Sequence, residues 1–217
     1  MKTSPLFPRY QDYVIKDGKF VGRFEEMYRD HLDPWEQKKE THATDKVLAV
    51  ALIQRIGAKT VLEIGCGFGH LTERIREAGI TVVGVDIAPT AIAKARGLYP
   101  AASFEVGELM DLERYRRIRP DVIAMSEITW YVLDKLDAFL AFLRSELQNT
   151  ALLHILTIYP PGVQKYGSDY FTNMAGIRRY FGERGMHFLE WGEHYASEGN
   201  GCGRSYFIGR WQESILC

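Results

Sequence analysis

The sequence predicts an α/β fold, with a mostly parallel sheet covered by helices on both faces and an antiparallel hairpin at its end. From residue 59, short β-branched segments alternate with helical patterns over about 100 residues, which is typical of parallel strands joined by helices. The last two extended segments have no helical pattern between them and must pair antiparallel. The 217 residues, 46% of them hydrophobic, suffice for one well-filled core.

The N-terminal residues 1–57 precede this alternation, and we expect them to form an arm and helices that cover a site within the same domain. Residues 1–19 show no periodicity and predict an irregular arm. Residues 20–32 place apolar side chains at helical spacing, and Asp33-Pro34-Trp35 ends this helix because proline disfavours helix in the preceding residue. A second helix is expected at residues 41–56.

The alternating region predicts five parallel strands followed by two antiparallel ones. The parallel strands are expected at residues 60–64, 80–85, 102–106, 121–125 and 152–158, and the final hairpin at 186–193 and 204–211. Helices are expected from Leu71 to Ala78, after Pro89, from Leu136 to Leu147 and at 172–184, with a helix or loop at 109–118.

Composition excludes several classes of protein. The formal net charge is -1, so no global field attracts nucleic acid. The N-terminus lacks an apolar leader, and the longest apolar run, Val47–Ile53, is far shorter than the roughly 18 residues of a membrane span. Three distant cysteines fit neither a disulfide framework nor a zinc site. We therefore expect a cytoplasmic protein without a metal.

A glycine-rich turn stands between the first predicted parallel strand and its helix, where backbone can approach a ligand closely. Its spacing, G-x-G-x-G from Gly65, departs from the dinucleotide pattern because His70 stands where the third glycine belongs, which disfavours NAD. The acid Glu63 precedes the turn and would repel phosphate. Asp86 ends the next strand, where a carboxylate can accept hydrogen bonds from ribose hydroxyls. This pairing predicts a ribonucleoside that carries a cationic group.

The sequence here resembles the class I S-adenosylmethionine-dependent methyltransferases over about residues 59–211. The motifs that carry the resemblance are VLEIGCGFG at 61–69, VVGVDIAPTAIAKAR at 82–96, VGEL at 106–109 and PDVIAMSEITWYV at 120–132. It implies a Rossmann-like, doubly wound, seven-stranded methyltransferase domain over residues 58–217. It also implies S-adenosyl-L-methionine as cofactor and S-adenosyl-L-homocysteine as product, with no metal.

The resemblance assigns a cofactor role to individual residues. Gly65 and Gly67 would line the methionine and ribose portion, Asp86 would bind the ribose, and Ile87 would pack on the adenine. Glu108 would face the adenine amino group. The complete expected cofactor set is Glu63, Gly65, Gly67, Asp86, Ile87, Glu108, Leu109, Ser126 and Trp35.

The methyl acceptor is expected past the carboxyl ends of the strands. Glu127 is the first candidate to contact it or hold its amine, although a structural carboxylate that caps a helix explains this position equally well. Tyr131 is the second candidate for a catalytic role. Aromatic residues could form a box over a cation or a flat ring, and the tentative substrate residues among them are Tyr28, Trp130, Tyr159 and Tyr166.

An acid followed by aromatics after the fourth strand resembles the small-molecule branch of the family, including nodulation-type N-methyltransferases, as does Asp33-Pro34-Trp35. We therefore expect a monomer or homodimer that methylates a small molecule, at an amine in preference to a hydroxyl or carboxyl. The alternatives are an RNA or protein methyltransferase, for which the basic segment Arg114–Arg119 leaves room, aminopropyl transfer, and a non-catalytic cofactor-binding module.

Overall fold

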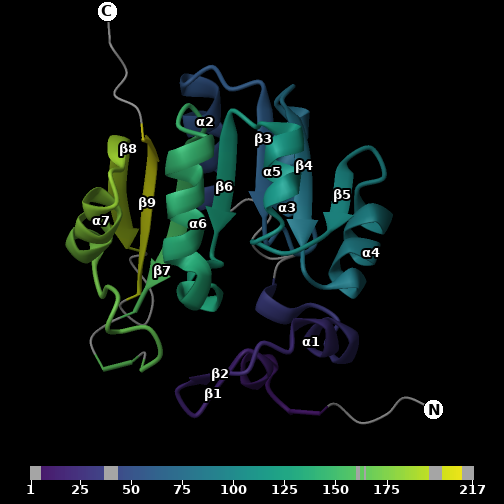
Figure 1. The fold of residues 1–217 in the computed structure, drawn as a ribbon. Helices are drawn as coiled ribbons and strands as arrows, with labels where there is room; N and C mark the ends of the chain where they lie inside the picture. Colours follow the sequence, from purple (N-terminus) through teal and green to yellow (C-terminus); the bar gives the residue numbers. More distant parts are fainter. Residues whose placement is uncertain (1–5, 37–43, 160–161, 164, 196–201, 212–217) are drawn as a thin grey trace, which may run out of the picture.

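The computed structural model describes residues 6–36, 44–159, 162–163, 165–195 and 202–211. Its large sheet is built from β3 (Thr60–Ile64), β4 (Thr81–Asp86), β5 (Ser103–Val106), β6 (Val122–Ser126), β7 (Ala151–Ile158), β8 (His187–Tyr195) and β9 (Gly203–Arg210). The strand order is β5-β4-β3-β6-β7-β9-β8 (Figure 1). The predicted seven-stranded sheet is confirmed.

The pairing of the strands follows the predicted directions. β3 pairs in parallel with both β4 and β6, so that Leu62 lies opposite Val83 on one side and Ile123 on the other. β9 runs antiparallel between β7 and β8, with Leu153 opposite Ile208. The β7–β9 register is continuous from the pair Leu152 and Gly209 to the pair Ile158 and Gly203. The C-terminal hairpin therefore completes the sheet as expected.

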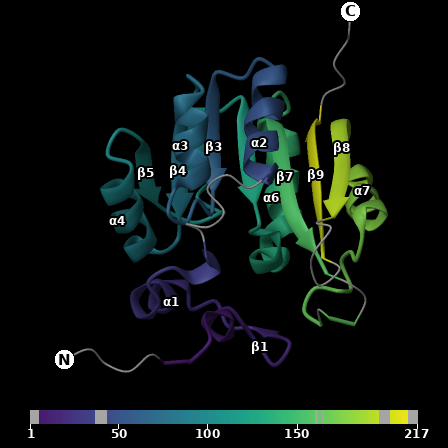
Figure 2. The same cartoon turned by 180° about the vertical axis from the view of Figure 1, so that it is seen from behind.

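Helices cover both faces of the sheet. One face carries α2 (Thr44–Arg55), α3 (His70–Glu77) and α4 (Pro89–Leu98), and the other carries α5 (Leu112–Ile118), α6 (Leu133–Glu146) and α7 (Met174–Glu183) (Figures 1 and 2). Side chains of β3 alternate between these layers, since Val61 packs with α2 and α3 while Leu62 packs with α6. Each fully buried leucine or isoleucine of these layers contributes about 1.5–3 kcal/mol.

The N-terminal segment lies below the carboxyl ends of the parallel strands (Figures 1 and 2). It comprises the 3-10 turn η1 (Tyr10–Tyr13), β1 (Ile15–Lys16), β2 (Lys19–Phe20), α1 (Phe24–Asp30) and the turn η2 (Pro34–Glu36). The expected irregular arm therefore contains a hairpin, because Asp17 and Gly18, with φ of 53° and 74°, form the tight turn that an Asp-Gly pair favours. The helix begins at Phe24 rather than at residue 20 because Phe20 is in the hairpin.

Polar contacts fasten α1 to α4. The Glu25 carboxylate accepts hydrogen bonds from the backbone N–H of Thr90 (2.9 Å) and from its hydroxyl (2.6 Å) in the first turn of α4. The Lys94 ammonium donates to the carbonyl oxygens of Tyr28 (2.8 Å) and His31 (3.3 Å) at the end of α1. Both helices thus satisfy terminal backbone groups of the other, which holds the N-terminal segment against the sheet domain.

No helix among the described residues is long and apolar enough to cross a membrane.

Candidate functional site

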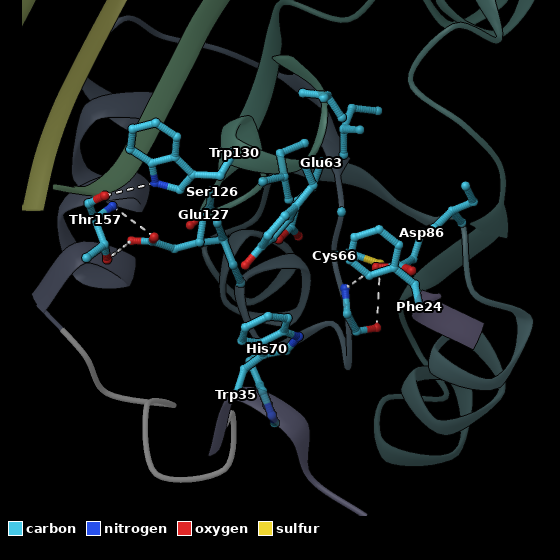
Figure 3. Close-up of a pocket in the computed structure, with 18 of the residues that line it drawn as sticks. Phe24, Trp35, Glu63, Cys66, His70, Asp86, Ser126, Glu127, Trp130 and Thr157 are labelled. Carbon is cyan, nitrogen blue, oxygen red and sulfur yellow. Dashed lines mark hydrogen bonds between the residues drawn. The ribbon is translucent and has the colours of Figure 1, made fainter. Parts of the chain in front are cut away.

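A cavity of about 360 Å³ opens at the carboxyl ends of β3, β4 and β6, with the N-terminal segment as its outer wall (Figure 3). The strands on either side of β3 are reached by chain connections that run in opposite directions, and ligands of α/β sheets bind at such a point. We call the part around Glu63, Gly65, Gly67 and Asp86 the glycine-loop end. We call the part around Asp45, Glu127, Thr157 and Arg204 the Arg204 end.

The glycine-loop end depends on backbone that only glycine can adopt without strain. Gly65 has φ +74°, and a Cβ built there would lie 2.2 Å from the Cγ2 of Ile128. The backbone N–H of Gly67 donates to Asp86 Oδ2 (2.9 Å), and that of Ala88 donates to Oδ1 (2.9 Å). Asp86 therefore ties two loops together and keeps lone pairs that can accept from hydroxyl groups. Burial raises the pKa of its carboxyl.

Glu63 lies under the glycine loop as a fully buried carboxyl that accepts a hydrogen bond from the Thr72 hydroxyl. Burial raises the pKa of Glu63 to about 7, although the nearby charge of Lys46 opposes this shift. This group therefore changes protonation near neutral pH within the wall of the cavity.

Glu127 stands at the Arg204 end on strained backbone. It follows β6 directly and has φ 61°, a conformation that non-glycine residues rarely adopt and that often marks functional positions. Its carboxylate accepts from the Thr157 N–H (2.9 Å) and hydroxyl (3.0 Å), and its Oε1 lies 3.5 Å from Arg204 Nε. Burial raises the pKa of Glu127 and Arg204 opposes that shift. Trp35, at φ 69°, is a second strained residue in the cavity wall.

Asp45 and Arg204 complete this end of the cavity, and they come from α2 and β9. Arg204 Nη1 lies 2.9 Å from Asp45 Oδ2, and the Asp45 side chain is only 4% exposed. The sequence analysis missed both residues. An aspartate in the first turn of a helix usually satisfies helix N–H groups, and an arginine on a strand is usually solvated, so neither position carries a local signal.

Aromatic side chains from the N-terminal segment and the β6–α6 connection enclose the cavity. The ring of Trp35 lies 4.8 Å from that of Tyr10 and 5.7 Å from that of Tyr131. Burial raises the pKa of Tyr131 well above its ordinary value, so this phenol stays protonated and can donate a hydrogen bond. The Trp130 indole N–H donates to the Thr157 carbonyl (3.0 Å), and this hydrogen bond fixes the ring in the cavity wall (Figure 3).

Most of the predicted site residues line this cavity. They are Glu63, Gly65, Gly67, Asp86, Ile87, Leu109, Ser126, Trp35, Glu127, Tyr131, Tyr28, Trp130 and Tyr159. Two others point elsewhere. Glu108 is exposed and places its carboxylate 3.6 Å from Lys135 Nζ, and the ring of Tyr166 stacks on Phe20 at 6.1 Å between centroids.

The wall also contains residues that the sequence analysis did not single out for the site, among them Tyr10, Phe24, Asp45, Lys46, Thr157 and Arg204. The Asp-Gly pair at 17–18 is a local signal for the hairpin that brings η1, which carries Tyr10, against α1, which carries Phe24. Within the described ranges, no group of three or more histidine, cysteine, aspartate or glutamate side chains could hold a metal ion.

Comparison with known proteins identifies the central part of the chain. A methyltransferase domain model matches residues 62–153. Ubiquinone biosynthesis O-methyltransferases are 30% identical over 124 residues in Thiobacillus denitrificans and 28% over 124 residues in Pseudomonas savastanoi. Each alignment covers 54% of this chain and 53% of the relative, so the chain spans about half the length of the curated relatives it matches.

Solved structures with similar folds cover more of the chain. Magnesium protoporphyrin IX methyltransferase from Synechocystis, solved with bound S-adenosylmethionine, covers 93% of this chain and 89% of its own at a TM-score of 0.60 and 20% identity. TehB from Haemophilus influenzae covers 83% of this chain and 67% of its own at a TM-score of 0.59 and 16% identity. These likenesses support the fold. The resemblance to nodulation-type N-methyltransferases stays a prediction.

Proposed function

We propose that the chain is a class I S-adenosylmethionine-dependent methyltransferase, with S-adenosylmethionine as its cofactor, and that it methylates a small molecule bound in the cavity. The observation that carries this proposal is the continuity of one cavity from the glycine-loop end to the Arg204 end. A nucleoside cofactor and a compact acceptor can meet in such a space.

At the glycine-loop end, the residues suit the cofactor. The turn at Gly65, which packs directly against Ile128, shapes the backbone of this end, and the Asp86 carboxylate retains lone pairs for ribose hydroxyls. Ile87, with 46% of its surface exposed, offers an apolar face for the adenine, and Leu109 faces the same space. Glu63 and Ser126 would complete this end.

At the Arg204 end, the residues suit the acceptor. The bound cofactor supplies an electrophilic methyl group on a sulfonium, which reacts by in-line displacement when the nucleophile is held at roughly 3 Å. Glu127, whose pKa burial raises, would accept the proton that the acceptor loses. The protonated phenol of Tyr131 would donate a hydrogen bond that orients the acceptor. The aromatic walls, including Trp35 and Tyr159, would exclude water.

We place oxygen first as the methylated atom, because the relatives that are similar to about half of this chain are named O-methyltransferases. An amine nitrogen is the second candidate, since the carboxylates of Asp45 and Glu127 both face the Arg204 end of the cavity. We also propose that residues 1–57 form part of the same domain, and that the protein works in the cytoplasm, where the buried free thiol of Cys66 persists.

The test is to incubate the purified full chain with methyl-labelled S-adenosylmethionine and fractionated cell metabolites, and to identify labelled products by mass spectrometry. We expect label in a small molecule, with fragmentation that places the methyl group on oxygen. Label on nitrogen would select the second candidate. Label that appears only in protein or RNA, or no label although the chain binds S-adenosylhomocysteine, would contradict a small-molecule methyltransferase.

A further inference from the structure

We propose that Asp45, held by Arg204, anchors a protonated amine of the methyl acceptor on the far side of the guanidinium from Glu127. The inference rests on the proposed function and names the class of acceptor, a small molecule that carries an ammonium group in addition to the atom that is methylated. Neither the comparisons nor the sequence motifs assign Asp45 or Arg204 to the site.

The first observation is an unsatisfied oxygen. Asp45 Oδ2 pairs with Arg204 Nη1 at 2.9 Å, but among the described residues Oδ1 has no hydrogen-bond partner, although it is buried. A buried carboxylate oxygen without a donor loses its hydration and gains no hydrogen bond in return. Native structures therefore contain few such oxygens, and each one calls for an explanation. Because Asp45 lines the cavity, a small shift of the side chains that cover Oδ1 would let a ligand supply the missing donor.

The second observation is the balance of charge around the cavity. Its described lining contains four carboxyl groups, Asp45, Glu63, Asp86 and Glu127, against two basic side chains, Lys46 and Arg204. At the Arg204 end alone, one guanidinium stands between two carboxyl groups, with Asp45 at 2.9 Å and Glu127 at 3.5 Å. A cationic acceptor reduces this excess of negative charge, whereas an anionic acceptor increases it.

The third observation is the aromatic part of the cavity wall. The ring of Trp35 packs against the rings of Tyr10 and Tyr131, and all three residues line the same cavity as Asp45 and Arg204. Aromatic faces attract ammonium groups, and the attraction grows when water is excluded. A neutral hydroxyl could satisfy Oδ1, but it would gain neither the charge-assisted hydrogen bond nor the contact with the rings.

The positions of the two carboxylates separate two tasks. Glu127 follows β6, and hydrogen bonds from Thr157 hold its carboxylate. Asp45 belongs to α2, and an ion pair with Arg204 of β9 holds its carboxylate. An amine that stays protonated at Asp45 is not a nucleophile, which agrees with methylation of an oxygen held near Glu127. Asp45 and Arg204 lie outside residues 62–153, so the preference for the acceptor would be encoded outside the segment that matches the methyltransferase domain model.

The experiment compares probes that differ only in charge. Tyramine and its neutral analogue tyrosol, and ethanolamine and ethylene glycol, are titrated into the full-length chain saturated with S-adenosylhomocysteine, by calorimetry at pH 7.5. We expect the amine of at least one pair to bind at least tenfold more tightly than its neutral partner. Asp45→Asn should reduce this preference to twofold or less, while affinity for S-adenosylhomocysteine stays within twofold.

Arg204→Gln distinguishes an electrostatic role of Arg204 from a purely structural one, because the two roles predict different changes in the preference for the amine probe. Removing the guanidinium increases the excess of negative charge at this end, so the preference for the amine should rise several-fold, whereas loss of local packing alone would weaken both probes without raising that preference. Glu113→Gln is the matched control, because Glu113 is 82% exposed on α5 and should change nothing.

Three outcomes would overturn the anchor: equal binding within both pairs, an unchanged amine preference in Asp45→Asn, or a lower preference in Arg204→Gln. A wild-type chain that binds S-adenosylhomocysteine but none of the four probes would also overturn it. A chain that fails to bind S-adenosylhomocysteine contradicts the proposed function itself, so the two failures are distinguishable.

Discussion

The two ends of the cavity are built in opposite ways. At the glycine-loop end, the chain supplies Glu63, Gly65 and Asp86 from two adjacent strands, and backbone conformation does most of the shaping. At the Arg204 end, side chains from α2, β6, β7 and β9 meet, and ion pairs and hydrogen bonds do the shaping. The difference shows that a short motif can specify a cofactor-binding end, while the acceptor-binding end depends on how distant segments pack.

The largest expected effect is at Gly65. Gly65→Ala puts a Cβ 2.2 Å from Ile128 on backbone at φ +74°, so the loop must move. We expect affinity for S-adenosylhomocysteine, measured by calorimetry, to fall at least a hundredfold. Gly97→Ala is the control, since a Cβ at this helical position meets nothing within 4 Å and should leave affinity unchanged. Retained affinity in Gly65→Ala would remove the claim that backbone shapes this end.

Glu127→Gln is expected to separate the two ends. The amide keeps the size of the side chain, and its oxygen can still accept from the Thr157 N–H while its NH2 donates to the Thr157 hydroxyl, but it cannot take a proton. Turnover of the identified acceptor should fall by roughly a hundredfold, in the range of a lost general base. Affinity for S-adenosylhomocysteine should stay within twofold. Turnover near that of the wild type would assign Glu127 a structural role only.

Glu63 predicts a dependence of stability on pH at the glycine-loop end. Its pKa of about 7 in the folded chain lies above the unfolded value of 4.5, so its stabilising effect is complete below pH 4.5 and is lost as pH rises through 7. Glu63→Gln removes this loss, which amounts to about 3 kcal/mol at most. Urea unfolding of the ligand-free chain at pH 5 and pH 8 should show a smaller decline in Glu63→Gln than in the wild type. Equal declines would contradict a strongly shifted Glu63.

The smallest expected effect is at the N-terminal hairpin. Gly18 has φ +74°, but a Cβ built there would fit, since the nearest atom to it would be the Cβ of Lys165 at 3.6 Å, an ordinary van der Waals contact. Gly18→Ala should therefore cost only about 1 kcal/mol of unfolding free energy, the usual penalty for a left-handed alanine. A cost of several kcal/mol would mean that the hairpin holds the cavity wall more firmly than its contacts indicate. Urea denaturation at pH 7 measures it.

The sequence could predict the sheet because each strand and helix carries its own periodicity, and most boundaries lie within two residues of expectation. It could not predict the meeting of Asp45 and Arg204, which are 159 positions apart and become neighbours only when β9 inserts between β7 and β8. Of the aromatic residues expected near the acceptor, Tyr28, Trp35, Trp130, Tyr131 and Tyr159 line the cavity and Tyr166 does not. Tyr166 shows why single members could not be chosen: its ring stacks on Phe20, a partner set by the hairpin turn at Asp17 that the analysis overlooked.

The fastening of α1 to α4 has a consequence for turnover. Glu25 holds the N-terminus of α4 and Lys94 holds the C-terminus of α1, so a motion that swings α1 away breaks charge-assisted hydrogen bonds at both ends of the contact. Product exit by such a swing would carry a high activation barrier. Ligand exchange that leaves α1 in place avoids this barrier. Substitutions that remove the Glu25 or Lys94 contacts would lower the barrier to the swing, and they would therefore change the lifetime of the bound product more than the rate of the chemical step.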